Sequence, residues 1–237
     1  MRKISEVERW TDRMKGVPCF LIGCGVGLIN VNLDILKPYF TIGLNRAYHK
    51  IDPTIVVWQD LDMWLKEGKE IKKLKAVKYC RIASHTSETG KDNFYHFNLT
   101  GRESKIPGSA SLLYGRGSSG AIGYQLAYIL GCDPIILVGM GCRKDKKIKY
   151  TSFYGNNPKY RPMTLKNCIK SLEWIKKVSK DRRTIINCSK SKVFEEIIPI
   201  EEVVKNTKNL EPHNREYGNV NFLGKSCLQN RRFSVGR

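Results

Sequence analysis

The chain alternates short apolar runs with amphipathic or polar segments. A run that is apolar on consecutive positions predicts a strand buried on both sides, as in a parallel sheet covered on both faces. Alternation of such strands with helices predicts an α/β protein with a Rossmann-like, doubly wound, mostly parallel sheet and helices on both faces. The expected strands are residues 18–23, 39–44, 54–58, 77–83, 134–139 and 184–188.

Helical spacing of apolar residues predicts two long helices, at 62–75 and 164–180. Residues 5–15 are expected to form a short amphipathic helix or an arm, and shorter helical pieces are expected at 30–36, 191–198 and 200–204.

The best-defined stretch is 115–141, which predicts a glycine-rich loop, a helix ended by Gly131 and a buried central strand. Ser118 or Ser119 can cap this helix. A helix start with open amides and hydroxyls is a natural anion site, although an ordinary cap between two core elements would give the same pattern.

The sequence divides into one domain and a tail. Residues 1–205 form a single nucleotide-binding domain, and 84–114 and 143–161, which lack a clear period, are expected to be active-site loops. Residues 206–237 carry isolated apolar residues among Asn, Arg, Lys and Gly, which predicts a basic tail that is extended or disordered.

Composition adds a strong positive charge. Lys and Arg number 42 against 22 Asp and Glu, a net charge of +20, which favours polyanionic partners such as DNA, or phosphorylated substrates; the alternative is a lysine-rich solvated surface. No window has the ~18 apolar residues of a membrane span, and the N-terminus lacks the apolar core of a secretion signal. The eight cysteines form no Cys-x-x-Cys pair, which favours reduced thiols in a cytoplasmic protein.

Ligands of such sheets bind beyond the carboxyl ends of the strands. Asn45 there offers a donor and an acceptor for a ribose hydroxyl or a base edge, and Arg46 and Arg116 can neutralise phosphate. The glycines that follow the first strand lack the dinucleotide-binding spacing but allow a tight turn under a phosphate or ribose. The candidate nucleotide-binding residues are Gly23, Gly25, Gly27, Asn45, Arg46, Arg116, Ser118, Ser119 and Gly120.

The candidate catalytic residues are Asp60, Tyr150, Tyr154 and His85. Asp60 and Asp62 follow a strand and can hold Mg²⁺ or Mn²⁺ against a diphosphate, or can simply begin a helix. Tyr150 and Tyr154 can donate to a leaving phosphate oxygen or stack on a base, with packing as the alternative. His85 can act as a general base, with a solvated loop position as the alternative.

A series of motifs over about residues 17–205 resembles a known family. It includes Gly23-Cys-Gly-Val-Gly-Leu, Gly43-Leu-Asn-Arg-Ala-Tyr and Gly117-Ser-Ser-Gly-Ala-Ile-Gly-Tyr. The series resembles phage and bacterial Rossmann-like proteins that are related to hydroxymethylpterin diphosphokinase-like proteins and, more distantly, to bacterial CMP-sialic-acid sialyltransferases.

The resemblance implies that the first glycine turn, Asn45 and Ser119-Gly120 hold a nucleotide, and that Tyr150 or Tyr154 reaches its leaving phosphate. Where relatives carry a histidine-rich segment, this chain reads Ser152-Phe-Tyr-Gly-Asn-Asn-Pro158, without histidine or aspartate.

Three functions remain open. The first is a transferase that uses a nucleotide-sugar donor, a glycosyltransferase that can act on modified DNA bases, in the host cytoplasm if the chain is phage-encoded. The second is a catalytically inactive module of the same fold that binds nucleic acid or a protein partner. The third is a metal-dependent diphosphokinase.

Overall fold

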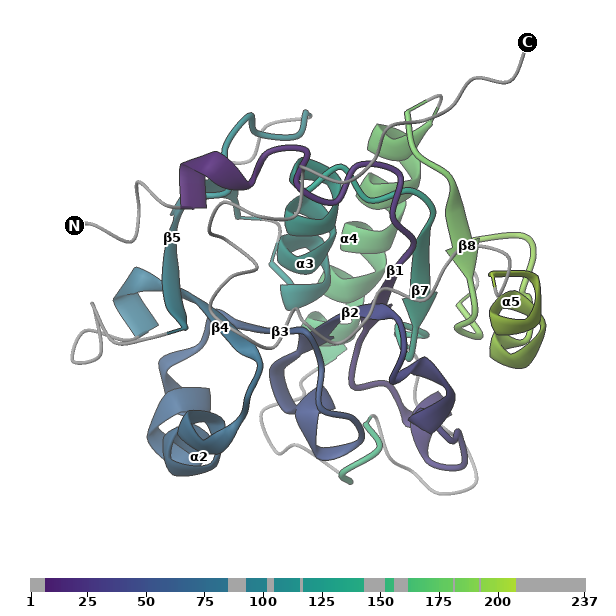
Figure 1. Cartoon of the computed structure of the whole chain (residues 1–237), viewed down its shortest axis with the longest axis horizontal. Helices are drawn as coiled ribbons and strands as arrows, with labels where there is room; N and C mark the ends of the chain where they lie inside the picture. Colours follow the sequence, from purple (N-terminus) through teal and green to yellow (C-terminus); the bar gives the residue numbers. More distant parts are fainter. Residues whose placement is uncertain are drawn as a thin grey trace, which may run out of the picture.

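The computed structural model describes residues 7–84, 93–101, 105–115, 117–142, 152–155, 162–180, 182–191 and 193–207. These residues build one sheet of eight parallel strands in the order β6-β5-β4-β3-β2-β1-β7-β8 (Figure 1). The predicted α/β, Rossmann-like, doubly wound fold is confirmed, and every strand pair is parallel. The strands are β1 (Cys19–Ile22), β2 (Phe40–Leu44), β3 (Ile55–Trp58), β4 (Val77–Arg81), β5 (Phe94–Thr100), β6 (Leu112–Tyr114), β7 (Ile135–Val138) and β8 (Ile185–Asn187).

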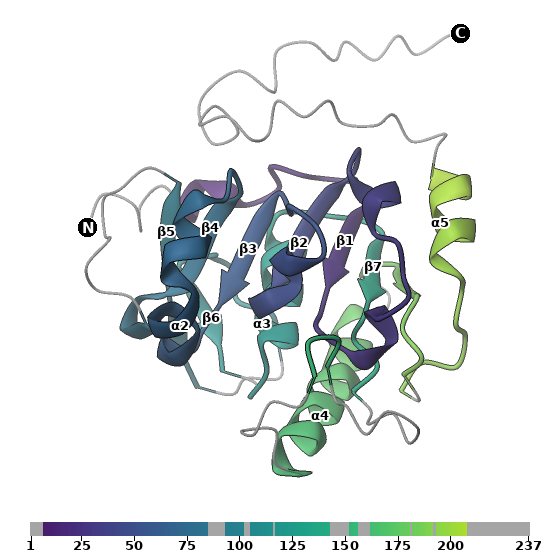
Figure 2. The same ribbon diagram turned by 90° about the horizontal axis from the view of Figure 1, so that it is seen from below.

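Helices cover both faces of the sheet. Figure 2 shows α2 in front of the sheet and α3 behind it. The α-helices are α2 (Leu61–Lys73), α3 (Ser119–Ile129), α4 (Pro162–Ser179) and α5 (Ile200–Thr207). The short 3-10 helices are η1 (Glu8–Trp10), η2 (Val26–Leu28), η3 (Asp34–Leu36), η4 (Asn45–His49) and η5 (Ile82–Ser84).

Strand β1 explains why the strands are apolar at consecutive positions. Cys19 and Leu21 belong to the core that contains α3 and α4, whereas Phe20 and Ile22 belong to the core that contains η2, η3 and α5. All four residues are fully buried. Side chains that point to either face of the sheet must therefore be apolar, so apolar and polar residues do not alternate along the strand.

Helix α3 packs closely on the sheet at Gly123, which faces it. A Cβ atom at this position would be 2.6 Å from Leu44 Cδ2 and 2.7 Å from Leu21 Cδ1. The close approach fixes α3 against β1 and β2. Since α3 follows β6, the helix starts at the edge of the sheet where the parallel strands end.

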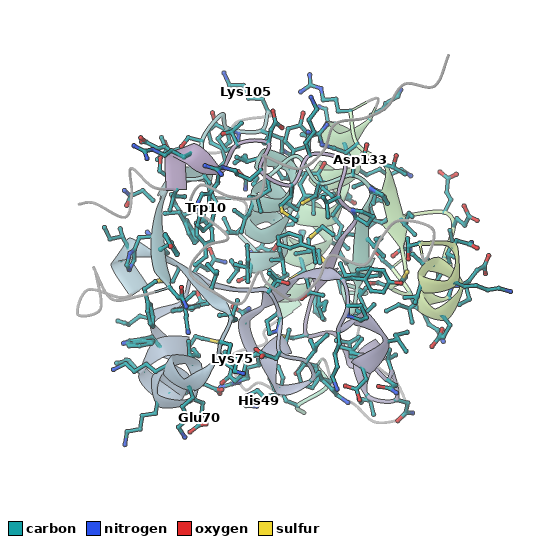
Figure 3. The ribbon with its side chains drawn as sticks, viewed as in Figure 1. Trp10, His49, Glu70, Lys75, Lys105 and Asp133 are labelled. Carbon is teal, nitrogen blue, oxygen red and sulfur yellow. The ribbon has the colours of Figure 1, made fainter. Side chains whose placement is uncertain are left out.

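The N-terminal segment packs across the opposite end of α3. The amide of Asp12 donates to the carbonyl of Ile129, and that of Met14 to the carbonyl of Leu130. Trp10, labelled in Figure 3, lies 5.6 Å from the ring of Tyr79. Of the helix or arm predicted over 5–15, the described residues contain the single turn η1, and the residues after it pack on α3 as an arm.

The prediction that 84–114 is an irregular loop is also wrong, because the segment contributes β5 and β6 to the sheet. Residues 30–36 form only the turn η3, and the described part of 191–198 contains no helix. Strand β7 is second from the edge of the sheet, not central. Helix α5 runs to Thr207, past the predicted start of the tail, and the rest of the tail lies outside the described residues.

Candidate functional site

A cleft of about 640 Å³ opens at the carboxyl ends of the strands. It lies where the strand order reverses, since β1 pairs with β2 on one side and with β7 on the other. Such a switch point is where doubly wound sheets bind ligands. The sequence-predicted residues that line the cleft are Gly23, Gly25, Asn45, Arg46, Asp60, Asp62, Ser118, Ser119, Gly120 and Tyr154.

The turn after β1 rests directly on the end of β7. The amide of Gly25 donates to the carbonyl oxygen of Gly139 at 2.7 Å, and a Cβ atom on Gly25 would lie 2.5 Å from that oxygen. Glycine is therefore required for this close backbone approach. Gly27, by contrast, is exposed in η2, has open space around its Cα and does not line the cleft.

A short chain of hydrogen bonds crosses the floor of the cleft. Gln59 Nε2 donates to Ser119 Oγ at 3.3 Å, and this hydroxyl donates to Asn45 Oδ1 at 3.3 Å. The chain links β3, α3 and β2. Asn45 adopts a left-handed backbone conformation with φ of 50°, which asparagine tolerates better than most residues.

Ser118 and Ser119 have different roles, which the sequence left open. Ser118 is the N-cap of α3, with an extended backbone, and its Oγ accepts from the amide of Ala121 at 3.3 Å. Ser119 is the first helical residue, and its hydroxyl faces Asn45. The first amides of a helix have no acceptor within the helix, so those of Ser119 and Gly120 form the positive end of α3 at the cleft.

Arg46 lies at the cleft between a carboxylate and an aromatic ring. Its Nε donates to Glu67 of α2, and its Cζ is 4.9 Å from the ring centroid of Tyr154. Burial opposes the charge of Arg46, but the bond to Glu67 outweighs it and raises the pKa of the guanidinium. Arg46 is therefore a fixed cation at this edge of the cleft.

Tyr154 reaches the cleft because residues 152–155 pack on the first glycine turn. Gly25 pairs with Ser152 in an antiparallel bridge, and the amide of Phe153 donates to the carbonyl of Cys24 at 3.1 Å. Burial raises the pKa of Tyr154, so its hydroxyl stays protonated at neutral pH. The protonated phenol can therefore donate a hydrogen bond to a ligand but cannot act as a base.

Two carboxylates stand at the end of β3. Asp60 is the residue before α2 and makes no side-chain capping bond, and Asp62 pairs with Lys66 at 3.7 Å. The part of the chain that the structure describes contains no group of three or more His, Cys, Asp or Glu side chains placed to hold a metal ion. A divalent ion at this place would need further oxygens from a bound diphosphate and from water.

The cleft also includes residues to which the sequence assigned no role. Gln59 and Met140 each stand just after a strand, which is the signal that predicts a place at this edge of the sheet. Cys142 and Cys168, the latter a residue of α4, also line the cleft. A hydrogen bond with Cys168, together with burial, raises the pKa of Cys142, which disfavours a reactive thiolate.

Three predicted residues lie outside the described residues: His85, Tyr150 and Arg116. Their suggested roles stay predictions. None of the described helices is long and apolar enough to cross a bilayer.

Comparison with known proteins gives little beyond this geometry. No family model matches the chain, and no curated protein matches it. Among solved structures, it is similar to the MAf glycosyltransferase from Magnetospirillum magneticum AMB-1, with 10% identity and a TM-score of 0.48. The match covers 87% of this chain and 41% of that protein, so the chain spans less than half of its length.

That likeness is too distant to assign an activity. What stands is the class: an α/β protein with a Rossmann-like parallel sheet and a polar cleft at its switch point.

Proposed function

We propose that this cleft binds a nucleotide sugar and that the protein is a glycosyltransferase. The observation that carries the proposal is a meeting of three features in one cleft: the glycine turn after β1, the Gln59–Ser119–Asn45 hydrogen-bond chain, and the start of α3. The glycine turn allows a phosphate or ribose to approach the backbone closely. The hydrogen-bond chain can bind hydroxyl groups or the edge of a base, and the start of α3 can bind an anion.

In this proposal the phosphates lie between the first amides of α3 and the guanidinium of Arg46. The ribose or base lies against Asn45 and Gln59. Because the Asn45 Oδ1 atom already accepts from Ser119, its Nδ2 group is the one that can donate to a ligand. Among the described residues, Nδ2 of Asn45 and Oε1 of Gln59 have no hydrogen-bond partner.

The reaction would be displacement at the anomeric carbon of the sugar. An acceptor hydroxyl loses its proton as its oxygen bonds to that carbon, and the bond from the carbon to the phosphate oxygen breaks. Arg46 and the protonated Tyr154 would stabilise the negative charge that develops on the leaving phosphate. Asp60 is the described candidate for the base that takes the proton.

Asp60 and Asp62 would also hold a Mg²⁺ or Mn²⁺ ion if the donor carries a diphosphate. The ion would neutralise phosphate charge, which is the role such ions take in many phosphate sites. Base and metal ligand are competing roles for Asp60, and with a monophosphate donor, which needs no bridging ion, Asp60 would act as the base.

The test is calorimetry with CMP, UDP, GDP and ADP and their sugar derivatives. We expect one base to bind, and Asn45→Ala and Ser119→Ala each to weaken that binding about tenfold, as for loss of a buried hydrogen bond. Asp34→Asn, an exposed change in η3 away from the cleft, is the matched control. Absence of binding by every member of the panel would refute the proposal.

The net charge of +20 favours a second candidate, a nucleic-acid-binding module that keeps the fold without the chemistry. It differs in an observable way. Binding of duplex DNA would fall steeply with salt and would survive Asn45→Ala and Ser119→Ala, with no sugar transferred. A modified DNA base as the acceptor belongs to the first proposal instead, and would show as transfer of labelled sugar to DNA.

A further inference from the structure

Glu67 is a largely buried carboxylate beside the cleft, although it does not line it. Its side chain is 14% exposed. Arg46 Nε and the Tyr48 hydroxyl donate to it, and His49 Nε2 lies 2.9 Å from it. Three side chains of η4 therefore converge on a single side chain of α2, which fixes the carboxylate in place.

This contact determines how Arg46 is presented. The bond to Glu67 occupies Nε, and the ring of Tyr154 lies 4.9 Å from Cζ. The remaining donors of a guanidinium are its two terminal amino groups, which form the fork that matches phosphate oxygens. A hydrogen bond to the Tyr154 side chain uses one N–H of these groups, and because Arg46 lines the cleft, the others are available to a ligand there.

We propose that Glu67 is a positioning residue that holds the Arg46 guanidinium against Tyr154, so that the terminal amino groups of Arg46 bind the nucleotide phosphates. The inference rests on the proposed function, since it names the phosphate-binding part of the same cleft. It assigns recognition of the phosphates to Arg46, held by α2, and leaves the ribose and base to Asn45 and Gln59.

A purely structural role for Glu67 has a different consequence. If Glu67 only fastened η4 to α2, its loss would disturb Asn45 and Arg46 together, because both belong to η4. Every ligand would then bind less well. If Glu67 positions Arg46, its loss weakens ligands that carry phosphate and spares those that do not.

The experiment compares each nucleotide with its own nucleoside: CMP with cytidine, UDP with uridine, GDP with guanosine and ADP with adenosine. Calorimetry is run on wild type, Glu67→Ala, Glu67→Gln and Arg46→Lys. We expect Glu67→Ala and Arg46→Lys to raise the Kd of the bound nucleotide about tenfold or more, the range for hydrogen bonds to charged groups, and to change the nucleoside Kd by less than about twofold. The double variant should bind the nucleotide no more weakly than Arg46→Lys alone.

Glu70→Gln is the matched control, since Glu70, labelled in Figure 3, lies on α2 but is exposed. Its carboxylate pairs with Lys73 at 2.8 Å. Glu67→Gln keeps an acceptor oxygen for Arg46 and should lose less affinity than Glu67→Ala, so it preserves the test if the alanine variant does not fold. Equal losses for nucleotide and nucleoside, or no loss for either, would overturn the inference while leaving the proposed function intact. If wild type binds no nucleotide, the proposed function itself fails.

Discussion

Ser119 and Asn45 are 74 residues apart in the chain, yet Ser119 Oγ donates to Asn45 Oδ1 at 3.3 Å. The bond joins the first residue of α3 to the residue that follows β2. Gln59 Nε2 donates to the same hydroxyl, so the orientations of both amide side chains depend on one serine. Binding of a ligand by the amide groups of Asn45 and Gln59, at the ends of β2 and β3, is thus coupled to the start of α3.

This coupling predicts a non-additive double-mutant cycle for nucleotide binding. Removing the Ser119 hydroxyl leaves the Asn45 amide free to turn, so part of its contribution is already lost in Ser119→Ala. We expect Ser119→Ala and Asn45→Ala together to weaken binding by less than the sum of the two single changes. The coupling energy should fall within about 0.5–3 kcal/mol, and calorimetry on the four proteins measures it.

Ser118→Ala is the control for this cycle, because Ser118 caps α3 without touching Asn45. It should lower the free energy of unfolding by about 0.5–2 kcal/mol, the usual cost of losing a helix cap. It should show no coupling to Asn45→Ala. Strict additivity between Ser119→Ala and Asn45→Ala would contradict the prediction.

The glycines after β1 give a second prediction. Gly25→Ala places a Cβ atom 2.5 Å from the Gly139 oxygen, so the turn must move away from β7. Overpacking of this kind costs about 1–3 kcal/mol of stability, and the moved turn should also weaken nucleotide binding. Gly27→Ala is the matched control, since nothing lies within 4 Å of its Cβ position. Thermal unfolding measures the stability of both variants, and calorimetry measures their affinity for the nucleotide. Equal effects of Gly25→Ala and Gly27→Ala would contradict the prediction.

The features that could be predicted from the sequence are those that depend on residues close to one another in the chain. Apolar runs located six of the eight strands, and the residues just after them gave most of the cleft. Asn45, Asp60 and Ser119 could be named because parallel strands bring their carboxyl ends to one edge. By that rule, residues that follow different strands can be predicted to lie near one another even when the order of the strands is unknown.

The parts that were missed depend on tertiary contacts. Strand β5 contains His96, which is buried, and ends in alternating exposed residues, so it lacks the continuous apolar run of the other strands. Glu67 resembles any acidic residue on a lysine-rich helix. Its importance comes from Arg46 and Tyr48, about twenty residues earlier, and nothing in the spacing indicates that these side chains meet.

The carboxylates at the end of β3 give a third prediction, on metal dependence. If Asp60 holds an ion against a diphosphate, Mg²⁺ should tighten binding of a nucleoside diphosphate to wild type and not to Asp60→Asn. Binding of the monophosphate should respond less, because it offers fewer oxygens to bridge. Calorimetry with and without a chelator measures this, with Asp34→Asn as the exposed control. Equal Mg²⁺ effects in wild type and Asp60→Asn would exclude Asp60 as a ligand.

A fourth prediction concerns stability at acidic pH and Glu67. Burial favours the neutral form of this carboxyl, but hydrogen bonds from Tyr48, His49 and Arg46 outweigh it and lower its pKa below the ordinary 4.5. A carboxyl with a lowered pKa in the folded state contributes stability above its unfolded pKa and loses it as pH falls through the folded value. The contribution should therefore be complete at pH 7 and decline only below 4.5.

Glu67→Gln cannot titrate, so it isolates this contribution. We expect wild type to melt at a higher temperature than Glu67→Gln at pH 7, and the difference to shrink as the pH is lowered below 4.5. Glu70→Gln, an exposed change on the same helix, should show little difference from wild type across this range, because exposed ion pairs contribute little. Melting curves recorded by circular dichroism give the comparison. A gap that stays constant down to the lowest pH would mean that the charge of Glu67 does not stabilise the fold, and that its contacts act through shape alone.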